Sequence, residues 1–215
     1  MTDDHDRLRQ RRRFLVTAGG AGMTAAVTRT LAQKLSEQLG ENVIPDNRPG
    51  AGGNLALAAV ARSAPDGYTL TISTPGIALS PSLYKNLQYD PQKDLAPITL
   101  VTRIPNVMVV SPKLPVSTIQ EFVAHAKKNP GRINYGTAGP GTLGHLGGEM
   151  MKRLAKIEII HVPYKGGVLA IQDVLGGHVQ MMFDAVTAMK SHVEAGQVRA
   201  LGTTGDKRSS VMPDL

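Results

Sequence analysis

A glycine-rich segment in the second half of the chain has the residue types and spacing of an anion-binding loop. Residues 139–144 read G-P-G-T-L-G and match the pattern G-x-G-x-x-G, between a β-rich stretch and a helical pattern. Backbone N–H groups at the start of a helix attract anions. The hydroxyls of Thr137 and Thr142 flank the loop and can donate to a carboxylate. The segment therefore predicts either a site for a small anion or simply a tight turn between strand and helix.

The same glycine pattern occurs in dinucleotide-binding folds, but two features disagree with that interpretation. Such folds place an acidic residue about 20 positions later, at the end of the next strand, to bind the ribose. Here that stretch ends at 161–165 with H-V-P-Y-K and holds no carboxylate. Pro140 also removes a backbone N–H that a phosphate would use. We therefore expect no nucleotide and no other cofactor.

Two further side chains are candidates for contact with a small ligand. His145 falls in the first turn after the loop, where an imidazole can donate to a carboxylate or only bond to the helix end. Asp184 follows an apolar strand pattern at 179–183. Its carboxylate can accept a ligand's hydroxyl or ammonium group, or cap the next helix. The sequence leaves both choices open.

Several other kinds of chemistry find no support in the sequence. The chain has no cysteine, which excludes disulfides and thiolate metal sites. Its six histidines form no i, i+4 pair and no H-E-x-x-H motif, so a catalytic zinc site is not expected. No G-x-S-x-G motif marks a hydrolase nucleophile.

The elements that must position these residues alternate between helix and strand. Leu31, Leu35 and Leu39 form a helical stripe that ends at Gly40, and a capping box at 117–120 begins a helix that stops at 129–131. Strand candidates lie at 43–45, 68–73, 98–102, 107–111, 133–136, 157–162, 179–183 and 198–203. Such alternation favours βαβ units and a largely parallel sheet. Ligands of open α/β sheets bind at the carboxyl ends of strands, so we expect two sheets that face a cleft.

Composition bounds the number of domains and the kinds of partner. A chain of 215 residues forms one large or two small domains. The net charge is +7, but there are only three Phe and five Tyr and no Trp, too few for a base-stacking platform. Beyond the first residues the basic side chains form no stripe along the sequence, so we expect no nucleic-acid partner.

The N-terminal segment has the pattern of an export signal. Five arginines stand between positions 7 and 13, ahead of a Gly- and Ala-rich apolar run at 14–27. This arrangement is typical of a secretory signal, and R-R-R-F-L at 11–15 resembles the twin-arginine motif. The run is too short for stable membrane insertion. The competing interpretation is a disordered basic arm before the first helix.

Ordered blocks of sequence between residues 30 and 215 carry a family pattern. They are L-A-Q-K-L-S-E-Q-L-G at 31–40, N-R-P-G-A-G-G-N at 47–54, A-P-D-G-Y-T-L at 64–70, P-S-L-Y at 81–84, N-Y-G-T-A-G at 134–139, H-L at 145–146, V-P-Y-K-G at 162–166 and M-F-D at 182–184. With these blocks the chain resembles the Bug (TctC-like) periplasmic substrate-binding proteins of tripartite tricarboxylate transporters.

The resemblance implies an α/β, two-lobed type II periplasmic binding protein fold. Such a protein captures a small carboxylate between its domains and delivers it to membrane permease subunits, without catalysis. Carried over by position, the ligand contacts are expected from Ser73, Thr74 and Gly76 in the first domain and from Thr137, Gly139, Thr142, His145 and Asp184 in the second.

Two departures from the family pattern predict an incomplete first domain. The family begins with a strand and a P-F-x-P-G-G loop, where this chain has its signal-like run, and the family continues beyond the position of Leu215 with a segment that returns to the first domain. We therefore expect a basic or signal-like arm at 1–29, an incomplete first domain at 30–101, a second domain at 102–204 and the start of the return segment at 205–215.

Three functional hypotheses follow. The first is a periplasmic carboxylate-binding protein, exported by a twin-arginine-like or Sec-type route. The second is an α/β enzyme that acts on a small acid, with His145 or Asp184 as the acid or base. The third is a degenerate remnant that binds nothing. Titration with di- and tricarboxylates together with product analysis separates the first two. Comparing the melting of the whole chain with that of residues 102–204 alone tests the third, in which only the second domain folds.

Overall fold

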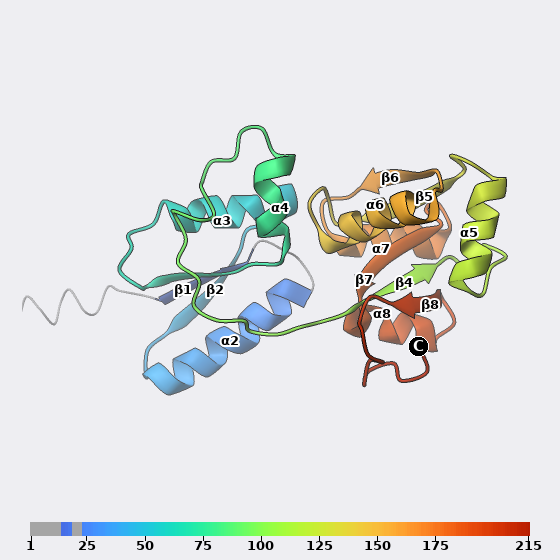
Figure 1. Cartoon of the computed structure of the whole chain (residues 1–215). Coiled ribbons are helices and arrows are strands. Elements are labelled where there is room, and N and C mark those ends of the chain that lie inside the picture. The colour runs from blue at the N-terminus through green and yellow to red at the C-terminus, as the bar shows by residue number, and fades with distance from the viewer. Residues whose placement is uncertain (1–13, 19–22) are drawn as a thin grey trace, which may run out of the picture. The chain divides into compact units, whose positions relative to one another are not determined.

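The described residues form two compact units, which divide between Ala96 and Pro97. The computed structural model describes residues 14–18 and 23–215 (Figure 1). Each unit has its own β-sheet with helices packed against it, one of three strands and one of five. The α/β class expected from the sequence is therefore confirmed in both units.

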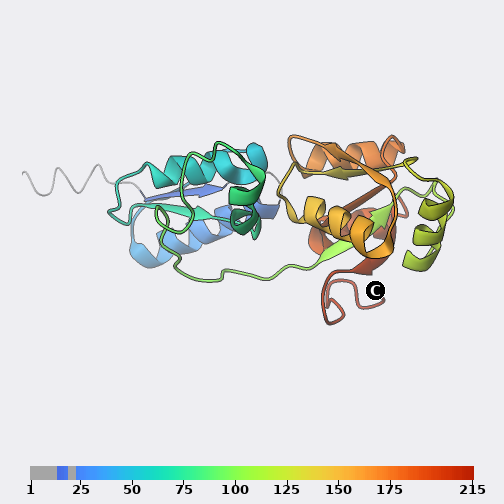
Figure 2. The same cartoon turned by 45° about the horizontal axis from the view of Figure 1, so that its top comes forward.

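The first unit is built on three parallel strands in the order β2-β1-β3. The strands are β1 (Phe14–Ala18), β2 (Val43–Asn47) and β3 (Thr69–Ile72), and the connecting helices are α2 (Met23–Leu39) and α3 (Asn54–Ala61). The chain passes from β1 through α2 to β2, and then through α3 across β1 to β3. Because such connections are right-handed, the two helices lie on opposite faces of the sheet, as Figures 1 and 2 show. A 3-10 turn, η1 (Ala51–Gly53), precedes α3, and α4 (Gly76–Leu83) follows β3.

The middle strand corrects the interpretation of the N-terminal segment. We expected residues 14–27 to be the apolar core of an export signal and the family's first strand to be missing. Instead β1 pairs with β2 on one side and β3 on the other, and Val16 and Ala18 are fully buried. A short apolar run suits a signal core and a central strand equally well, so composition alone did not separate them. The arginines of the twin-arginine pattern lie outside the described residues.

The second unit contains a mixed sheet in the order β6-β5-β7-β4-β8. Its strands are β4 (Asn106–Val110), β5 (Ile133–Thr137), β6 (Ile159–Pro163), β7 (Met181–Ala185) and β8 (Arg199–Thr203). β5 runs parallel to β6 and β7, whereas β4 runs antiparallel to both β7 and β8. The expectation of a largely parallel sheet is therefore right for the first unit, and in the second unit it is wrong only for β4, which runs opposite to the other four strands.

Two hydrophobic cores cover the two faces of this sheet. Alternate residues of β4 belong to one core or the other, because successive side chains of a strand point to opposite faces of the sheet. Met108 and Val110 pack with Phe122 of α5 (Ile119–Lys128) and Tyr135, on the face that also carries α6 (Leu143–Ala155). Val107 and Val109 pack in the other core, against α7 (Gly167–Gly176) and α8 (Val186–Glu194).

Two local expectations differ from the structure. Residues 98–102 form no strand, and Ile98 and Leu100 are 77% and 66% exposed, because this β-branched run finds no partner strand. The capping box lies one residue later than expected. Thr118 accepts a hydrogen bond from the N–H of Glu121 at 3.1 Å, and the Glu121 carboxylate accepts the N–H of Ser117 at 2.6 Å.

The last residues of the chain pack on the second unit. Met212 is buried in the core beside α7 and α8, and Val211 and Leu215 pack against the same core. Among residues 14–18 and 23–215, no helix is both long and apolar enough to cross a membrane.

Candidate functional site

The predicted anion loop connects β5 to α6 in the second unit. β5 ends at Thr137 and α6 begins at Leu143, as the sequence indicated. Gly139 and Gly141 have φ values of 124° and 81°, which residues with a Cβ rarely adopt. The two glycines therefore allow the chain to turn from the end of the strand into the first turn of the helix.

The two threonines of this loop hold it in shape. Thr142 caps α6: its hydroxyl accepts the N–H of His145 at 3.4 Å and donates to the carbonyl of Gly139 at 2.7 Å. Thr137 is buried, and its hydroxyl accepts the N–H of Gly139 at 3.1 Å. The N–H groups of Leu143 and Gly144 lie in the first turn of α6, where a helix has no intrahelical acceptor for them. These amides are the donors that the helix end offers to an anion.

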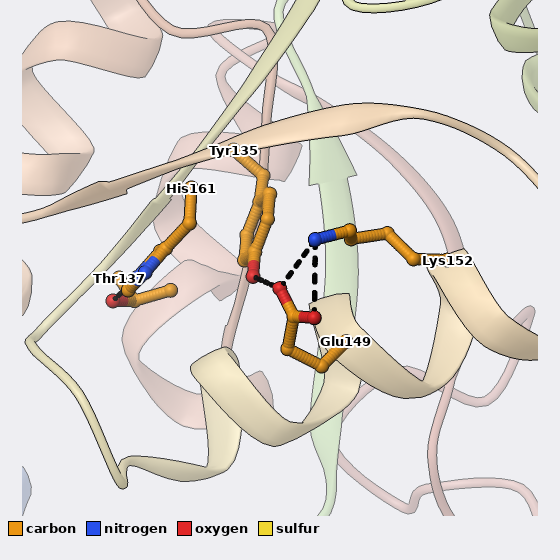
Figure 3. A network of polar contacts seen from close by, with 5 residues as sticks. All are labelled: Tyr135, Thr137, Glu149, Lys152 and His161. Atoms are coloured by element: carbon orange, nitrogen blue, oxygen red, sulfur yellow. Dashed lines mark hydrogen bonds and ion pairs between the residues drawn. The ribbon is translucent and has the colours of Figure 1, made fainter.

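Two stacked imidazoles lie beside the loop. The rings of His145 and His161 are 4.4 Å apart between centroids, and His161 also stacks on Tyr135 at 4.9 Å. The N–H of Gly141 donates to Nδ1 of His145 at 3.3 Å. Nε2 of His161 lies 2.7 Å from the hydroxyl of Thr137, the contact that Figure 3 shows. Each imidazole is thus bonded to one side of the glycine loop.

A charged pair on α6 completes the network in Figure 3. The Tyr135 hydroxyl donates to Glu149 at 2.6 Å, and Nζ of Lys152 lies 2.9 and 3.1 Å from the two carboxylate oxygens. Burial pushes the pKa of Glu149 upward, but the bonds from Tyr135 and Lys152 outweigh it, so the pKa lies below its ordinary value. Burial, reinforced by the Glu149 carboxylate, raises the pKa of Tyr135.

His161 favours its neutral form. Burial lowers its pKa below the ordinary value for histidine, and the neighbouring His145 lowers it further, against the opposite effect of the Glu149 carboxylate. At neutral pH a neutral ring offers one nitrogen as an acceptor and the other as a donor.

Asp184 lies at the carboxyl end of β7, the strand beside β5. Its Oδ1 accepts the N–H of Ala185 at 2.7 Å, and its Oδ2 lies 2.9 Å from where a Cβ on Gly167 would stand. Glycine at the start of α7 therefore leaves room for the carboxylate. Burial raises the pKa of Asp184, and the bond from Ala185 offsets only part of that effect.

A close approach of helix to strand brings the loop to the end of β7. A Cβ on Gly144 would stand 2.8 Å from the carbonyl oxygen of Phe183, the residue before Asp184. Thr137, Gly139, Thr142 and His145 therefore belong to one constellation, with Asp184 at the neighbouring strand end. The sequence missed His161 and Tyr135. A single histidine in a strand carries no motif, and only strand pairing, Tyr135 with His161, brings the two side chains together.

The predicted residues of the first unit form a separate loop after β3. Ser73 and Thr74 are exposed, and the hydroxyl of Ser73 donates to the carbonyl of Thr74 at 3.1 Å. Gly76 is buried as the first residue of α4. The loop thus resembles the one after β5 in that it joins a strand's carboxyl end to a helix.

The second unit also has a cavity of about 510 Å³ on another part of its surface. Lys190 and Glu194 of α8, Arg199 of β8 and residues 211–215 line it, and none of the predicted site residues does. Within the described part of the chain, no group of three or more acidic or histidine side chains is arranged to hold a metal ion.

Comparison with known families and sequences gives consistent matches. The family model of the tripartite tricarboxylate transporter family receptor, TctC, matches residues 27–215. The UPF0065 protein in the gbd 5' region of Cupriavidus necator is 39% identical over 199 residues, 93% of this chain and 60% of that protein. BugT of Bordetella pertussis is 34% identical over 194 residues, 89% of this chain and 60% of BugT. The chain therefore spans about three fifths of the length of these curated relatives.

Solved structures show the same similarity. The periplasmic binding protein BugD superposes with a TM-score of 0.88 at 35% identity, over 95% of this chain and 69% of BugD. Rpa4515 of R. palustris, solved with adipate, gives 0.86 at 36% identity over 92% of this chain and 68% of its own. MatC of Rhodopseudomonas palustris, with bound malate, gives 0.85 at 29% identity over 94% and 70%.

These similarities support two of the sequence expectations. The family resemblance and the periplasmic binding protein fold are confirmed. The family is described as a transporter receptor and BugD as a periplasmic binding protein, which favours binding over an enzyme with His145 or Asp184 as acid or base.

Proposed function

Because the chain belongs to the TctC family of receptors of tripartite tricarboxylate transporters, we propose that it captures a small carboxylate and delivers it to a membrane permease. The proposed location is the periplasm, because the similar protein BugD is a periplasmic binding protein. In this proposal the two units close on the ligand, with contacts from the strand-end loops of both.

The geometry of the β5–α6 loop is the main observation that supports this proposal. Its hydroxyls are used to shape the loop, which leaves the amides of Leu143 and Gly144 as donors at the positive end of a 13-residue helix. A hydrogen bond to a charged group contributes roughly 1.5–3 kcal/mol, and the helix end adds about 0.3–1 kcal/mol. Three or four such contacts sum to roughly 4.5–12 kcal/mol before the cost of ordering is subtracted, a range that includes the roughly 8 kcal/mol of micromolar binding.

The remaining contacts are assigned by position. Gly139 and Thr142 are proposed to fix the conformation of the loop. Nε2 of His145 is proposed to donate to the carboxylate, because Nδ1 of the same ring accepts the N–H of Gly141. Ser73, Thr74 and Gly76 are proposed to bind the ligand from the first unit. Asp184 is proposed to accept a hydroxyl or ammonium group of the ligand, because its second oxygen is not used by Ala185.

A short dicarboxylate is the proposed class of ligand. Two relatives of similar fold were solved with adipate and with malate, which are both dicarboxylates. The charge of +7 would attract such an anion to the protein but does not select among anions.

Isothermal titration of the purified chain with adipate, malate and citrate tests the proposal, with methylammonium chloride as a cationic control. We expect saturable binding of one carboxylate per chain and unchanged ligand after prolonged incubation. A chemically altered ligand would contradict a binding-only protein. Absence of heat with every carboxylate, in a chain with a cooperative melting transition, would support the degenerate remnant instead.

A further inference from the structure

We propose that His161 is a positioning residue for the carboxylate loop: its neutral ring accepts a hydrogen bond from Thr137, and protonation of the ring weakens ligand binding. The inference rests on the proposed function of the β5–α6 loop. His161 lies on β6, outside that loop, and its hydrogen bond to the loop segment is made through the side chain of Thr137.

The hydrogen of the Thr137 hydroxyl has two acceptors within reach. Nε2 of His161 is 2.7 Å away, and the carbonyl oxygen of Gly139 is 3.4 Å away. That carbonyl already accepts the hydroxyl of Thr142 at 2.7 Å and the N–H of Thr142 at 3.4 Å. The Thr137 hydroxyl therefore makes a better hydrogen bond to His161 than to Gly139. That bond requires an unprotonated Nε2 and a proton on Nδ1 of the His161 ring.

Protonation of His161 changes which group donates. Nε2–H would then donate to Thr137, whose own hydrogen would have to turn toward Gly139 and compete with Thr142 for one carbonyl. A carbonyl oxygen has two lone pairs, so the third donor weakens the cap that holds the start of α6. The loop is therefore held best when His161 is neutral.

His145 supports the same conclusion from the other side of the loop. Its Nδ1 accepts the N–H of Gly141, and a proton on that nitrogen would break the bond. The two stacked rings, with centroids 4.4 Å apart, therefore accept hydrogen bonds through different nitrogens. Nδ1 is unprotonated in His145 and Nε2 is unprotonated in His161.

The charges that face His161 come from two neighbouring elements. Tyr135 of β5 stacks on it, and His145, Glu149 and Lys152 of α6 act on it electrostatically. The Glu149 carboxylate is bonded to both Tyr135 and Lys152, so its charge is already partly offset. Burial and His145 consequently dominate, and the neutral ring is retained at neutral pH.

The first test reads the tautomers directly and needs no ligand. Nitrogen-15 NMR of the imidazoles in the full chain at pH 7.5 should show a proton on Nδ1 of His161 and on Nε2 of His145. The reverse tautomer of His161, or a doubly protonated ring at this pH, would overturn the proposal. A positive result here with no binding of adipate or malate would contradict the proposed function and leave the positioning of the loop by His161 standing.

The second test measures adipate and malate affinity for two variants of His161. His161→Gln keeps an acceptor near the position of Nε2 but does not titrate, whereas His161→Leu removes the acceptor. At pH 7.5 we expect His161→Gln to bind within about twofold of the native chain and His161→Leu to bind about two- to tenfold more weakly, the value of one hydrogen bond. His178→Gln, an exposed histidine in the same unit, is the matched control and should change nothing.

The pH dependence of ligand affinity shows whether protonation of His161 weakens or strengthens binding. Comparing the native chain with His161→Gln at the same pH cancels the ionisation of the ligand itself. Because the pKa of His161 is lowered, we expect the native chain to lose affinity relative to His161→Gln as the pH falls from 7.5 to about 4.5. A relative gain of affinity on acidification would mean that the ring attracts the anion by its charge, and equal binding of His161→Leu would mean that it does not position the loop. Either result would overturn the proposal.

Discussion

The ring of Tyr135 lies directly against the backbone of Gly148: a Cβ at position 148 would stand 2.2 Å from the nearest ring carbon. Tyr135 is fully buried in β5, and Gly148 faces it from the middle of α6. This contact sets how closely the helix approaches the sheet, and with it the position of the loop that begins the helix.

Substitution Gly148→Ala should destabilise the second unit. Alanine gains up to about 1 kcal/mol of helix propensity, but a fully buried aromatic ring cannot move aside without overpacking, which costs about 1–3 kcal/mol or more. A Cβ only 2.2 Å from the ring puts the overpacking near the upper end of that range, so we expect a net loss of about 2 kcal/mol in the free energy of unfolding, measured by chemical denaturation. Arg153→Ala, on the exposed side of the same helix, is the control. A Gly148→Ala chain as stable as the control would contradict the close approach.

The shifted capping box of α5 makes a paired prediction. Thr118→Ala removes the hydroxyl that accepts the N–H of Glu121 and should cost about 0.5–2 kcal/mol in unfolding free energy. Ser117→Ala should cost almost nothing, because Ser117 contributes only its backbone N–H to the box. Thermal melting of both variants compares them. The opposite order would favour the box at 117–120 that the sequence suggested.

The bond from Tyr135 to Glu149 should make part of the stability depend on pH. Because the folded pKa of Glu149 is lowered, this contribution is complete above the unfolded value of about 4.3 and is lost as the pH falls through the folded pKa. Tyr135→Phe should therefore lower the unfolding free energy by about 1 kcal/mol at pH 7, a value discounted for the partial exposure of Glu149.

The difference between native chain and Tyr135→Phe should shrink as the pH falls from 5 to 3. Denaturation in a Glu149→Gln background supplies the control, since no carboxylate titrates there. A difference that stays constant with pH in the native background would show that Tyr135 acts only through packing.

Strand β1 predicts that residues 14–18 remain part of the folded protein. Val16 is fully buried between two strands, and an unpaired carboxylate in its place would cost several kcal/mol. Val16→Asp should unfold the first unit, seen as rapid proteolysis within residues 23–96 while the second unit stays resistant. Arg29→Asp, exposed on α2, should leave the pattern unchanged. Native resistance of Val16→Asp would mean that the segment acts as a dispensable leader.

Local signals in the sequence predicted most elements of the second unit. The strand predicted at 133–136, the loop glycines and the stop at 129–131 each depend on residues close together in the chain. Each appears where expected, with the strand one residue longer. Gly40 likewise ends α2 with a φ of 67°. The patterns worked because they report conformational preferences of the residues themselves.

Features set by distant residues were missed. The antiparallel direction of β4 depends on the pairing of segments about 75 residues apart, which no local pattern encodes. Residues 98–102 have strand composition but no partner, so they stay exposed. His161 reaches Thr137 only because β6 pairs with β5, and β1 was mistaken for a signal because both need short apolar runs.

Amide chemical-shift mapping with adipate and malate tests the central claim most directly. The claim is that a carboxylate binds at the β5–α6 loop through the start of α6. We predict that saturating ligand shifts the amide signals of Leu143 and Gly144 most strongly, together with those of Gly139 and Gly141. Shifts confined to the cavity beside Lys190 and Arg199, with those four amides unmoved, would contradict the account.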